Sequence, residues 1–334
     1  MTLPSTPSNG KARTAIAQLT QRITRRRRIR LLLWLGVAGF IILIGWLLNS
    51  HEGGFYLLPL ADWVNIGVDW LIINLAVMFN GIKVATAVVL NNFERFLLWL
   101  PWWSVLALIM LLAWQLSSAR VAIFSGAAMY FIGMLGLWDL CMSTLALIAT
   151  AVLISVALGI PVGILCARSD RVDGLVRPIL DAMQTMPAFV YLIPALMFFG
   201  IGKVPGVVAT VIFALPPAVR LTNLGIRQVP KELVEAGHAF GSTTRQLLFK
   251  VQLPLALPSI MAGVNQVIML ALSMVVLAAM IAAGGLGREV FMALGQVDAG
   301  RGFAAGTAIV LVAMVLDRVT QALGKKKRGM IKAV

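Results

Sequence analysis

The sequence has few of the side chains on which enzymes and metal sites depend. Its 334 residues include only two histidines, two cysteines and 13 acidic residues. His51 and His238 are too few for a histidine-based zinc site or a charge relay. Cys141 and Cys166 lie at opposite ends of one apolar run, so they cannot form a disulfide with each other. A phosphate-cradling loop of the form G-x-x-x-x-G-K-[ST] is also missing. The sequence therefore predicts that this chain is not an enzyme and binds no cofactor of its own.

Apolar residues, by contrast, make up 60% of the chain, and charged residues only 12%. This is more apolar surface than a soluble domain of this length can bury. Apolar runs of roughly 18 to 25 residues recur, long enough for a hydrocarbon core of about 30 Å. The fold predicted is an all-α integral membrane protein with about eight transmembrane helices. These are Leu31–Leu48, Leu97–Ala119, Val121–Trp138, Ser143–Ala167, Met186–Gly200, Val204–Leu221, Ser259–Ala283 and Phe303–Gln321.

The net charge of +15 follows the predicted spans and does not form a folded basic face. If residues 1–30 form a basic cytoplasmic tail and each span crosses once, the basic tail 322–334 is cytoplasmic too. All but five of the 28 Lys and Arg residues then face the cytoplasm. This asymmetry is what the positive-inside rule describes. We therefore expect both termini in the cytoplasm and no nucleic-acid partner.

Residues 49–96 are predicted to be an extracytoplasmic segment that does not cross the membrane. Asp62, Asn65 and Asp69 fall on one helical face, which is typical of an amphipathic helix lying in the outer interface. A second candidate, 82–90, is short for a span and is followed by polar residues. Counting only one of the two as a crossing would reverse the side of every later basic loop. Either both cross or neither does, and the simpler expectation is that neither does.

Ionisable groups at membrane depth are nearly absent from the predicted spans. Asp139, Asp181 and Asp317 lie near span ends, where solvated positions are expected. A proton- or sodium-coupled carrier would need an acidic residue near the midplane. Asn265 and Gln266 are the most polar pair within a span. Hydrogen bonding between helices and a place on a translocation path both account for them.

The stretch VEAGHAFGSTTRQLLFKVQLPLALP, residues 234–258, has the punctuation of two short helices. Pro230 suits a first helical position, and Gly241 is a natural helix terminator. Thr243 stands three residues before Gln246, the spacing of a capping box, and we expect Pro254 to stop the second helix. A docking surface for another protein and a plain connector between spans remain open.

The same stretch resembles a known motif. Glu235-Ala236-Gly237, then Gly241, then Val251-Gln252-Leu253-Pro254 is similar to the EAA loop, E-A-A-x3-G-x9-I-x-L-P, of ABC importer permeases. Gly237 and Val251 depart from it conservatively. Residues 138–321 as a whole resemble the membrane subunits of glycine betaine/proline betaine importers.

The resemblance implies a MetI-like permease at 97–321, with its EAA loop at 230–254, in a bacterial inner membrane. Such permeases are usually homodimers within the lipid bilayer, paired with two cytoplasmic ATPase subunits that bind the ATP. An extracytoplasmic betaine-binding protein delivers the solute. A choline-type permease and, as a different class, an ATP-independent secondary carrier are the alternatives. The motif residues expected to seat on the ATPase are Glu235, Ala236, Gly237, Gly241, Val251, Leu253 and Pro254.

Two further groups of residues are candidates for roles in transport. Thr185, Phe189, Tyr191, Asn265, Gln266 and Ser273 are candidates for the translocation path, with core packing as the alternative. Gly284, Gly285 and Gly287, within the run AAGGLG, are candidates for an outer turn or gate.

Overall fold

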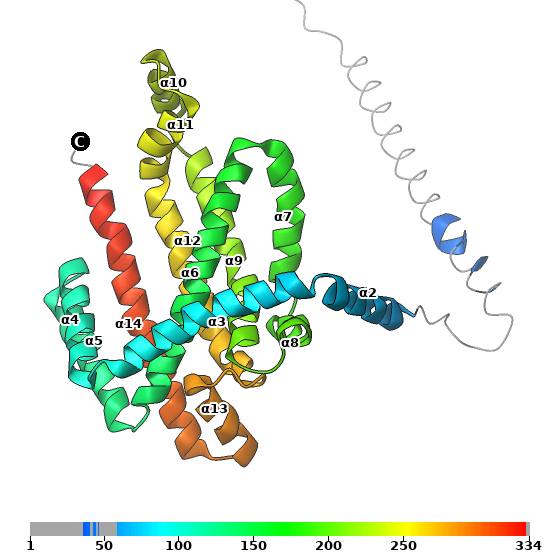
Figure 1. Ribbon diagram of the computed structural model, residues 1–334. Helices are drawn as coiled ribbons and strands as arrows, with labels where there is room; N and C mark the ends of the chain where they lie inside the picture. The colour runs from blue at the N-terminus through cyan, green and yellow to red at the C-terminus, as the bar shows by residue number, and fades with distance from the viewer. Residues whose placement is uncertain (1–35, 41–42, 45, 47–58, 332–334) are drawn as a thin grey trace, which may run out of the picture. The chain divides into compact units, whose positions relative to one another are not determined.

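The computed structural model describes residues 36–40, 43–44, 46 and 59–331, and the predicted all-α fold is confirmed across them (Figure 1). These residues contain no strand. The elements are α2 (Leu60–Asn74), α3 (Ala76–Trp99), α4 (Trp102–Leu116), α5 (Ala119–Met134), α6 (Trp138–Arg168), α7 (Asp170–Thr185), η1 (Ala188–Tyr191), α8 (Leu192–Phe199), α9 (Lys203–Arg227), α10 (Lys231–Ala239), α11 (Thr244–Leu247), η2 (Leu248–Gln252), α12 (Leu253–Ala279), α13 (Gly285–Gln296) and α14 (Ala299–Ile331).

The chain divides into two compact units, Met1–Asp69 and Trp70–Val334. Helix α2 begins in the first unit and ends in the second, and it confirms the helix predicted around Asp62 and Asn65. The predicted span Leu31–Leu48 lies largely outside the described residues. The features described from here on belong to the second unit.

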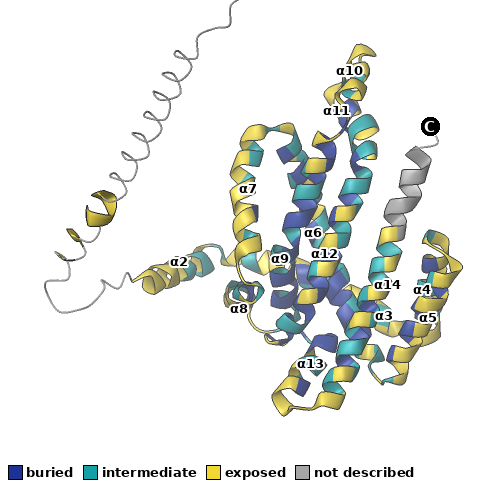
Figure 2. Cartoon of the chain, turned by 180° about the vertical axis from the view of Figure 1, so that it is seen from behind, coloured by how far each residue is buried: buried dark blue, intermediate teal, exposed yellow. Residues whose placement is uncertain are grey.

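Helices α6, α9 and α12 form the centre of the second unit, where the buried residues gather (Figure 2). Small residues bring the backbones of α6 and α9 close together. A Cβ added to Gly159 would lie 2.5 Å from the Cβ of Ala218, and one added to Gly163 would lie 2.6 Å from the Cβ of Thr222. Glycine at such crossings is typical of membrane helices, whose association depends on close packing more than on the hydrophobic effect.

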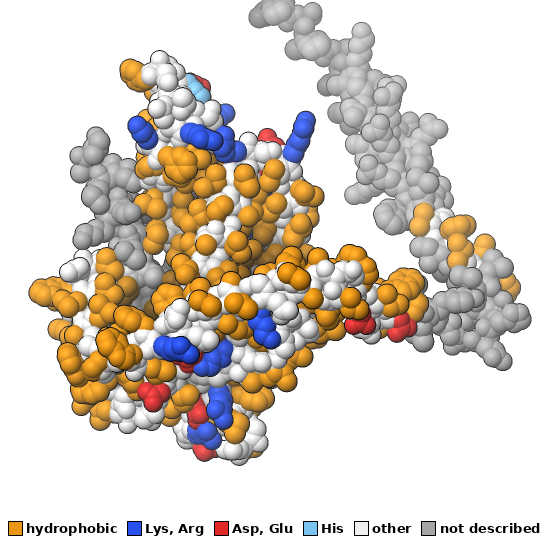
Figure 3. Space-filling view, in the orientation of Figure 1, with side chains coloured by type: hydrophobic (Ala, Val, Ile, Leu, Met, Phe, Trp, Pro, Cys, Tyr) orange, Lys and Arg blue, Asp and Glu red, His pale blue; other side chains and the backbone are white. Residues whose placement is uncertain are grey.

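Charged side chains gather around α10 and α11 at one end and around α3 and α13 toward the other, with a hydrophobic zone between them (Figure 3). The turn between α6 and α7 and the end of α14 lie on the side of α10 and α11 (Figure 1). This arrangement agrees with the predicted alternation of loops, because the later basic loops all come to one end.

Five helices of the described part of the chain are long and apolar enough to cross a membrane, or six if a bent pair counts as one span. Four of them, α6, α9, α12 and α14, contain the core of a predicted span. The predicted spans Leu97–Ala119 and Val121–Trp138 correspond to the shorter helices α4 and α5, of 15 and 16 residues. The total of eight crossings stays a prediction.

The view of 82–90 as a short separate segment was wrong. It is the middle of α3, a continuous helix of 24 residues that meets the length and composition of a span. The helix continues through the polar residues after 90 because the carboxylate of Glu94 has partners elsewhere in the fold. It accepts hydrogen bonds from Ser143 of α6, at 2.6 Å, and from Lys203 of α9. Helix α3 runs obliquely across the bundle (Figure 1), and the interfacial placement of 49–96 stays a prediction.

The predicted span Met186–Gly200 is not one continuous helix, and its helical part is only η1 and α8. Residues 170–185, expected to be a loop, form the amphipathic helix α7, and the chain then bends by 109° into η1 and α8. The bend falls at Met186, which has extended backbone because Pro187 follows it. The two arms form either a broken span or a re-entrant loop, and neither arm is a complete crossing.

Candidate functional site

Residues 230–254, which we call the coupling loop after the role that the resemblance implies, form a helical projection at one end of the bundle (Figure 1). Helix α10 begins after Pro230, which takes the N-cap position and not the predicted first helical position. The predicted end of this helix is confirmed. Phe240 is its C-cap, and Gly241 has φ +75°, a left-handed conformation that glycine adopts at little cost.

The predicted capping box is confirmed at the start of α11. The Gln246 backbone N–H donates to Thr243 Oγ1 at 3.3 Å, and the Thr243 N–H donates to Gln246 Oε1 at 2.9 Å. The predicted stop at Pro254 was wrong, because the helix passes through the π-helical turn η2 into α12. There the Leu253 N–H donates to the carbonyl of Leu248, five residues back. The wider turn accommodates the missing N–H of Pro254 without ending the helix.

The predicted docking residues of the coupling loop fall into an exposed group and a half-buried group. Glu235, Ala236, Gly241 and Pro254 are exposed, whereas Gly237, Val251 and Leu253 are half-buried. The end of the Leu247 side chain packs over Gly237, where an added Cβ would lie 2.6 Å from Leu247 Cδ1.

Two aromatic side chains project from the coupling loop into open space. Phe240 is 91% exposed and Phe249 is 64% exposed. Apolar surface of this kind at the charged end of a bundle is typical of a protein–protein contact. The sequence analysis did not single out either phenylalanine.

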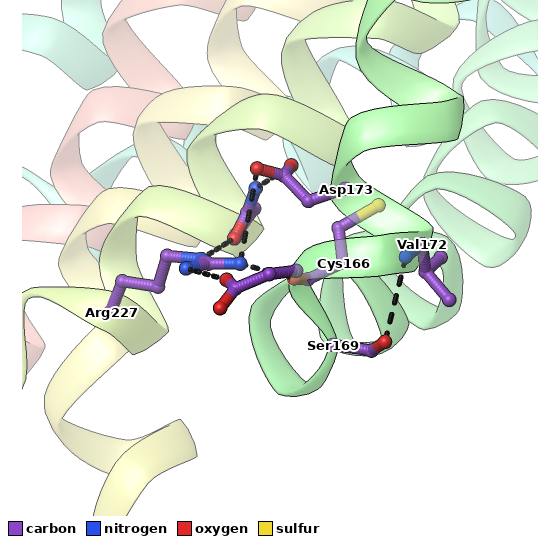
Figure 4. Close-up of polar contacts among 7 residues, drawn as sticks. Cys166, Ser169, Val172, Asp173 and Arg227 are labelled. Atoms are coloured by element: carbon purple, nitrogen blue, oxygen red, sulfur yellow. Dashed lines mark hydrogen bonds and ion pairs between the residues drawn. The ribbon is translucent and has the colours of Figure 1, made fainter.

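An ion cluster fixes the end of α9 from which the coupling loop starts (Figure 4). Arg227 donates to Asp170 Oδ1 at 2.7 Å, to the carbonyl oxygen of Cys166 at 2.8 Å and to Asn223 Oδ1 at 2.8 Å. Asn223 in turn donates to Asp173 Oδ1 at 2.7 Å. The cluster joins α6, α7 and α9, so it holds the base of the coupling loop in place. Sequence reasoning missed it because α7 was read as a loop.

Replacing Arg227 with glutamine should lower the free energy of unfolding by about 1 kcal/mol, since a partly exposed ion pair is screened by solvent. We expect a melting temperature about 2–4 °C lower in detergent, measured by thermal unfolding. The exposed Arg171, which has no ion pair among the described residues, supplies the control Arg171→Gln. The difference between the two variants should shrink at high salt. Equal melting temperatures at low salt would contradict a holding role.

The candidate path residues before α9 do not form one lining. Thr185 and Phe189 are exposed, whereas Tyr191 is buried and its hydroxyl donates to the carbonyl of Met183 at 2.5 Å. Tyr191 also packs in a cluster with Met274 of α12. Its side chain is therefore packed in the core, as the alternative considered for it describes, and a contact with the solute stays a prediction.

The candidates on α12 also separate. Asn265 donates to Asp317 Oδ1 at 3.2 Å and accepts from Thr320 Oγ1 at 2.7 Å, both on α14. Gln266 is exposed on another side of α12, and Ser273 is exposed with its hydroxyl bonded to its own helix. The expectation that Asp317 is simply solvated was wrong, because it is half-buried against the amide of Asn265.

The glycine run at the start of α13 makes a tight turn, as predicted. Gly284 and Gly285 have φ values of +81° and +67°. The Leu286 N–H donates to Thr144 Oγ1 of α6 at 2.7 Å in a fully buried contact. A Cβ on Gly287 would clash with the backbone carbonyl of Val275. The turn is thus packed against α6 and α12, and a role as a gate stays a prediction.

The described part of the chain contains no group of three or more His, Cys, Asp or Glu residues that could hold a metal ion. What the geometry shows is a membrane-type bundle with one exposed helical projection at a charged end.

Comparison with known proteins agrees with this geometry. Residues 159–329 match the family model described as binding-protein-dependent transport system inner membrane component. The glycine betaine/proline betaine transport system permease protein ProW of Escherichia coli (strain K12) is 51% identical over 82% of this chain and 77% of that protein. The glycine betaine transport system permease protein OpuAB of Bacillus subtilis (strain 168) is 51% identical over 81% of this chain and 96% of that protein.

A solved structure of the MetNI methionine ABC transporter in inward-facing conformations has the same fold. It covers 57% of this chain and 95% of the solved chain, with a TM-score of 0.54 at 21% identity. The predicted MetI-like fold is therefore confirmed. The family model and the relatives show that the chain belongs to the family of binding-protein-dependent transport system inner membrane components, and it is a multi-pass permease subunit of an ABC transporter.

Proposed function

We propose that this chain carries glycine betaine, proline betaine or a closely related quaternary ammonium solute into the cell. The observation that supports this most strongly is the identity of about half of all aligned positions with permeases named for glycine betaine, over four fifths of the chain. A third relative, the glycine betaine/carnitine transport permease protein GbuB of Listeria monocytogenes, is 50% identical over 81% of this chain.

Membership in the family implies an ATPase and a substrate-binding protein as partners. We place the ATPase on the coupling loop, in the cytoplasm together with both chain termini. The exposed Glu235, Ala236 and Gly241 and the projecting Phe240 form the contact surface. ATP is bound and hydrolysed by that partner, and the permease contributes no catalytic residue.

Transport follows from differential binding of the two partners to two states of the permease. A ligand shifts an equilibrium only as far as it prefers one state, and moving a ratio of about 1:99 to 99:1 takes about 5.5 kcal/mol. The continuous helix from α11 through η2 to α12 runs from the coupling loop into the membrane zone. It can transmit a displacement of the loop directly to the spans. The ion cluster around Arg227 holds the base of the loop, so that little of this displacement is lost there.

The exposed face of α12 lines the proposed translocation path. Ala262, Gln266, Met269, Ser273 and Met280 follow one another at helical spacing and are all exposed. A glutamine amide that faced lipid would leave its hydrogen-bonding groups unsatisfied, which is costly in hydrocarbon. We therefore place a second copy of the chain opposite this face, with the solute passing between the two copies.

Replacing Gln266 with leucine should leave the protein in the membrane and reduce uptake. A hydrogen bond to a charged solute contributes about 1.5–3 kcal/mol, so we expect the apparent KM for uptake to rise about tenfold or more. Uptake kinetics with radiolabelled glycine betaine measure this change. Gln266→Asn, which keeps an amide, should retain more of the affinity than Gln266→Leu. Unchanged kinetics in the leucine variant would remove Gln266 from the path.

The function itself is tested by reconstituting the full system in vesicles. The permease, its ATPase and its binding protein should take up radiolabelled glycine betaine only when ATP is present on the side of the coupling loop. Unlabelled proline betaine, choline and carnitine compete to different extents and rank the solutes. Uptake by the permease alone without ATP would support a secondary carrier instead.

A further inference from the structure

A polar groove of about 340 Å³ lies between α7 and α9, beside the ion cluster of Arg227. Charged side chains line it from both helices: Asp173, Arg177 and Asp181 from α7, and Arg220 and Arg227 from α9. Leu180 and Val219, both buried, are the apolar part of its lining. The groove therefore presents charges of both signs around a small apolar surface.

The groove follows α7 from the end near the coupling loop toward the bend at Met186. Asp181 comes eleven residues after Asp170, about 16 Å along the helix axis. Leu175 and Ile179, both exposed, lie on a different side of α7 from these carboxylates and suit contact with lipid. Ionisable side chains in a membrane segment face the protein interior or a water-filled cavity, and they often mark the path of a solute. We therefore expect water in this groove.

The groove adjoins the exposed face of α12. Thr222 of α9 packs against α6, and Leu221 of α9 packs against Gly263 of α12. Leu224, which is exposed and lines the groove, is three residues after Leu221 and on the side of α9 away from Thr222. Gln266, three residues after Gly263, is exposed as well. The groove thus lies next to the face of α12 that we place on the translocation path.

Arg177 is the one charged residue of this lining that has no ion pair among the described residues. Asp181, four residues after it, pairs with Arg220. Asp173, four residues before it, has its Oδ2 atom 3.8 Å from Nη2 of Arg227 (Figure 4). The groove therefore has one unmatched positive charge, at Arg177, with a carboxylate on either side of it along the helix.

A betaine has the matching chemistry. In glycine betaine a single CH₂ group separates the carboxylate from the quaternary ammonium, and residues four apart on a helix have Cβ atoms about 5–6 Å apart. A carboxylate bound to Arg177 therefore leaves the ammonium close to Asp173 or Asp181. A phosphate, free or on a lipid, could also pair with Arg177, but both aspartates would repel it. A quaternary ammonium without a carboxylate would be repelled by the arginine.

We infer that this groove is an inner site for the transported solute, in which the carboxylate of a betaine binds Arg177 and its quaternary ammonium lies beside Asp173 or Asp181. The inference rests on the proposed function. Binding at this site is weak, because both aspartates keep their own partners and the described residues that line the groove include no aromatic side chain. Weak binding suits a site from which the solute leaves for the cytoplasm.

The test labels a cysteine in the groove of the full permease–ATPase complex, in nanodiscs without nucleotide. Leu224→Cys places a thiol there at an exposed position. Cys141 and Cys166 are both buried, so a water-soluble methanethiosulfonate should label the new thiol alone. We expect rapid labelling that millimolar glycine betaine slows. Leu175→Cys, on the lipid side of α7, should stay unlabelled, because a thiol in hydrocarbon does not ionise.

Arg177→Gln in the Leu224→Cys chain should raise the glycine betaine concentration that halves the labelling rate about tenfold or more. Each variant is compared with its own rate without solute, because Arg177 also affects the approach of a charged reagent. Arg171→Gln, exposed on α7 outside the groove, should leave that concentration unchanged. Choline, which lacks the carboxylate, and inorganic phosphate, which lacks the ammonium, should each protect only at concentrations about tenfold higher or more.

Three results would overturn the inference: equal labelling of Leu175→Cys and Leu224→Cys, protection by phosphate as strong as by glycine betaine, or protection unchanged by Arg177→Gln. Phosphate protection would identify a general anion site, open to lipid headgroups. Uptake by the reconstituted system separates this inference from the proposed function. ATP-dependent uptake of glycine betaine without protection in the groove rejects the inner site alone, whereas absence of that uptake with the unchanged chain rejects the proposed function and the inner site with it.

Discussion

Replacing Gly241 with valine should reduce solute uptake at least about tenfold while the protein remains in the membrane. A β-branched residue at φ +75° is disfavoured by about 1–2 kcal/mol. The turn between α10 and α11 therefore either bears this strain or rearranges. Both outcomes oppose seating of the loop on the ATPase, and about 1.4 kcal/mol corresponds to a factor of ten. Uptake of radiolabelled glycine betaine by the complete system, with an immunoblot of the membrane fraction, measures the effect.

A matched control lies four residues away. Gly237→Ala should retain uptake, because the added Cβ meets only the flexible end of the Leu247 side chain, which can shift. Glu235→Lys should behave like Gly241→Val, because it reverses the charge of an exposed loop residue without touching the fold. Normal uptake together with normal ATPase co-purification in the valine variant would show that the coupling loop does not transmit the conformational change.

The contrast between Gly241 and Tyr191 shows what could be predicted from the sequence. The turn at Gly241 and the capping box of Thr243 and Gln246 depend on residues within a few positions of each other, so the local sequence is enough to predict them. Tyr191 was a candidate for the path as part of a predicted span, with core packing as the alternative. Its burial against Met274, 83 positions later, depends on packing that no local pattern records.

The spans show the same division. Long apolar runs in the sequence predict helices α6, α9, α12 and α14. Helix α3 was cut short because Glu94 looked like the end of an apolar segment. Its partners Ser143 and Lys203 are 49 and 109 positions away. Helix α7 was missed because its many charged residues resemble a loop, although part of that charge pairs with the end of α9.

These non-local contacts lie at the two ends of the central bundle. Arg227 joins α6, α7 and α9 beside the coupling loop. At the opposite end, Glu94 links α3, α6 and α9, and Thr144 links α6 to the first turn of α13. Between the ends, α6, α9 and α12 pack through glycines with no ion pair among their described residues. A helix bundle fastened at both ends transmits a displacement as a rigid-body motion more readily than one held only at its middle.

Replacing Gly287 with alanine tests whether contacts at the α13 end hold the central bundle together. The added Cβ would clash with the Val275 backbone carbonyl, which cannot move away as a side-chain end can. Overpacking of this kind lowers the free energy of unfolding by about 1–3 kcal/mol. We expect a melting temperature several degrees lower in detergent, with about 2–4 °C for each kcal/mol.

Gly295, exposed on the same helix with open space around it, supplies the opposite expectation. Gly295→Ala should be neutral or stabilising by up to about 1 kcal/mol, because alanine favours the helix. If the turn at 284–287 opens as a gate during transport, Gly287→Ala should also slow uptake in complexes that are still folded at the assay temperature. Unchanged uptake by a folded Gly287→Ala complex would show that this turn stays fixed during transport. If Gly287→Ala and Gly295→Ala have equal melting temperatures, the α12–α13 junction accommodates the added Cβ freely and does not hold this end of the bundle together.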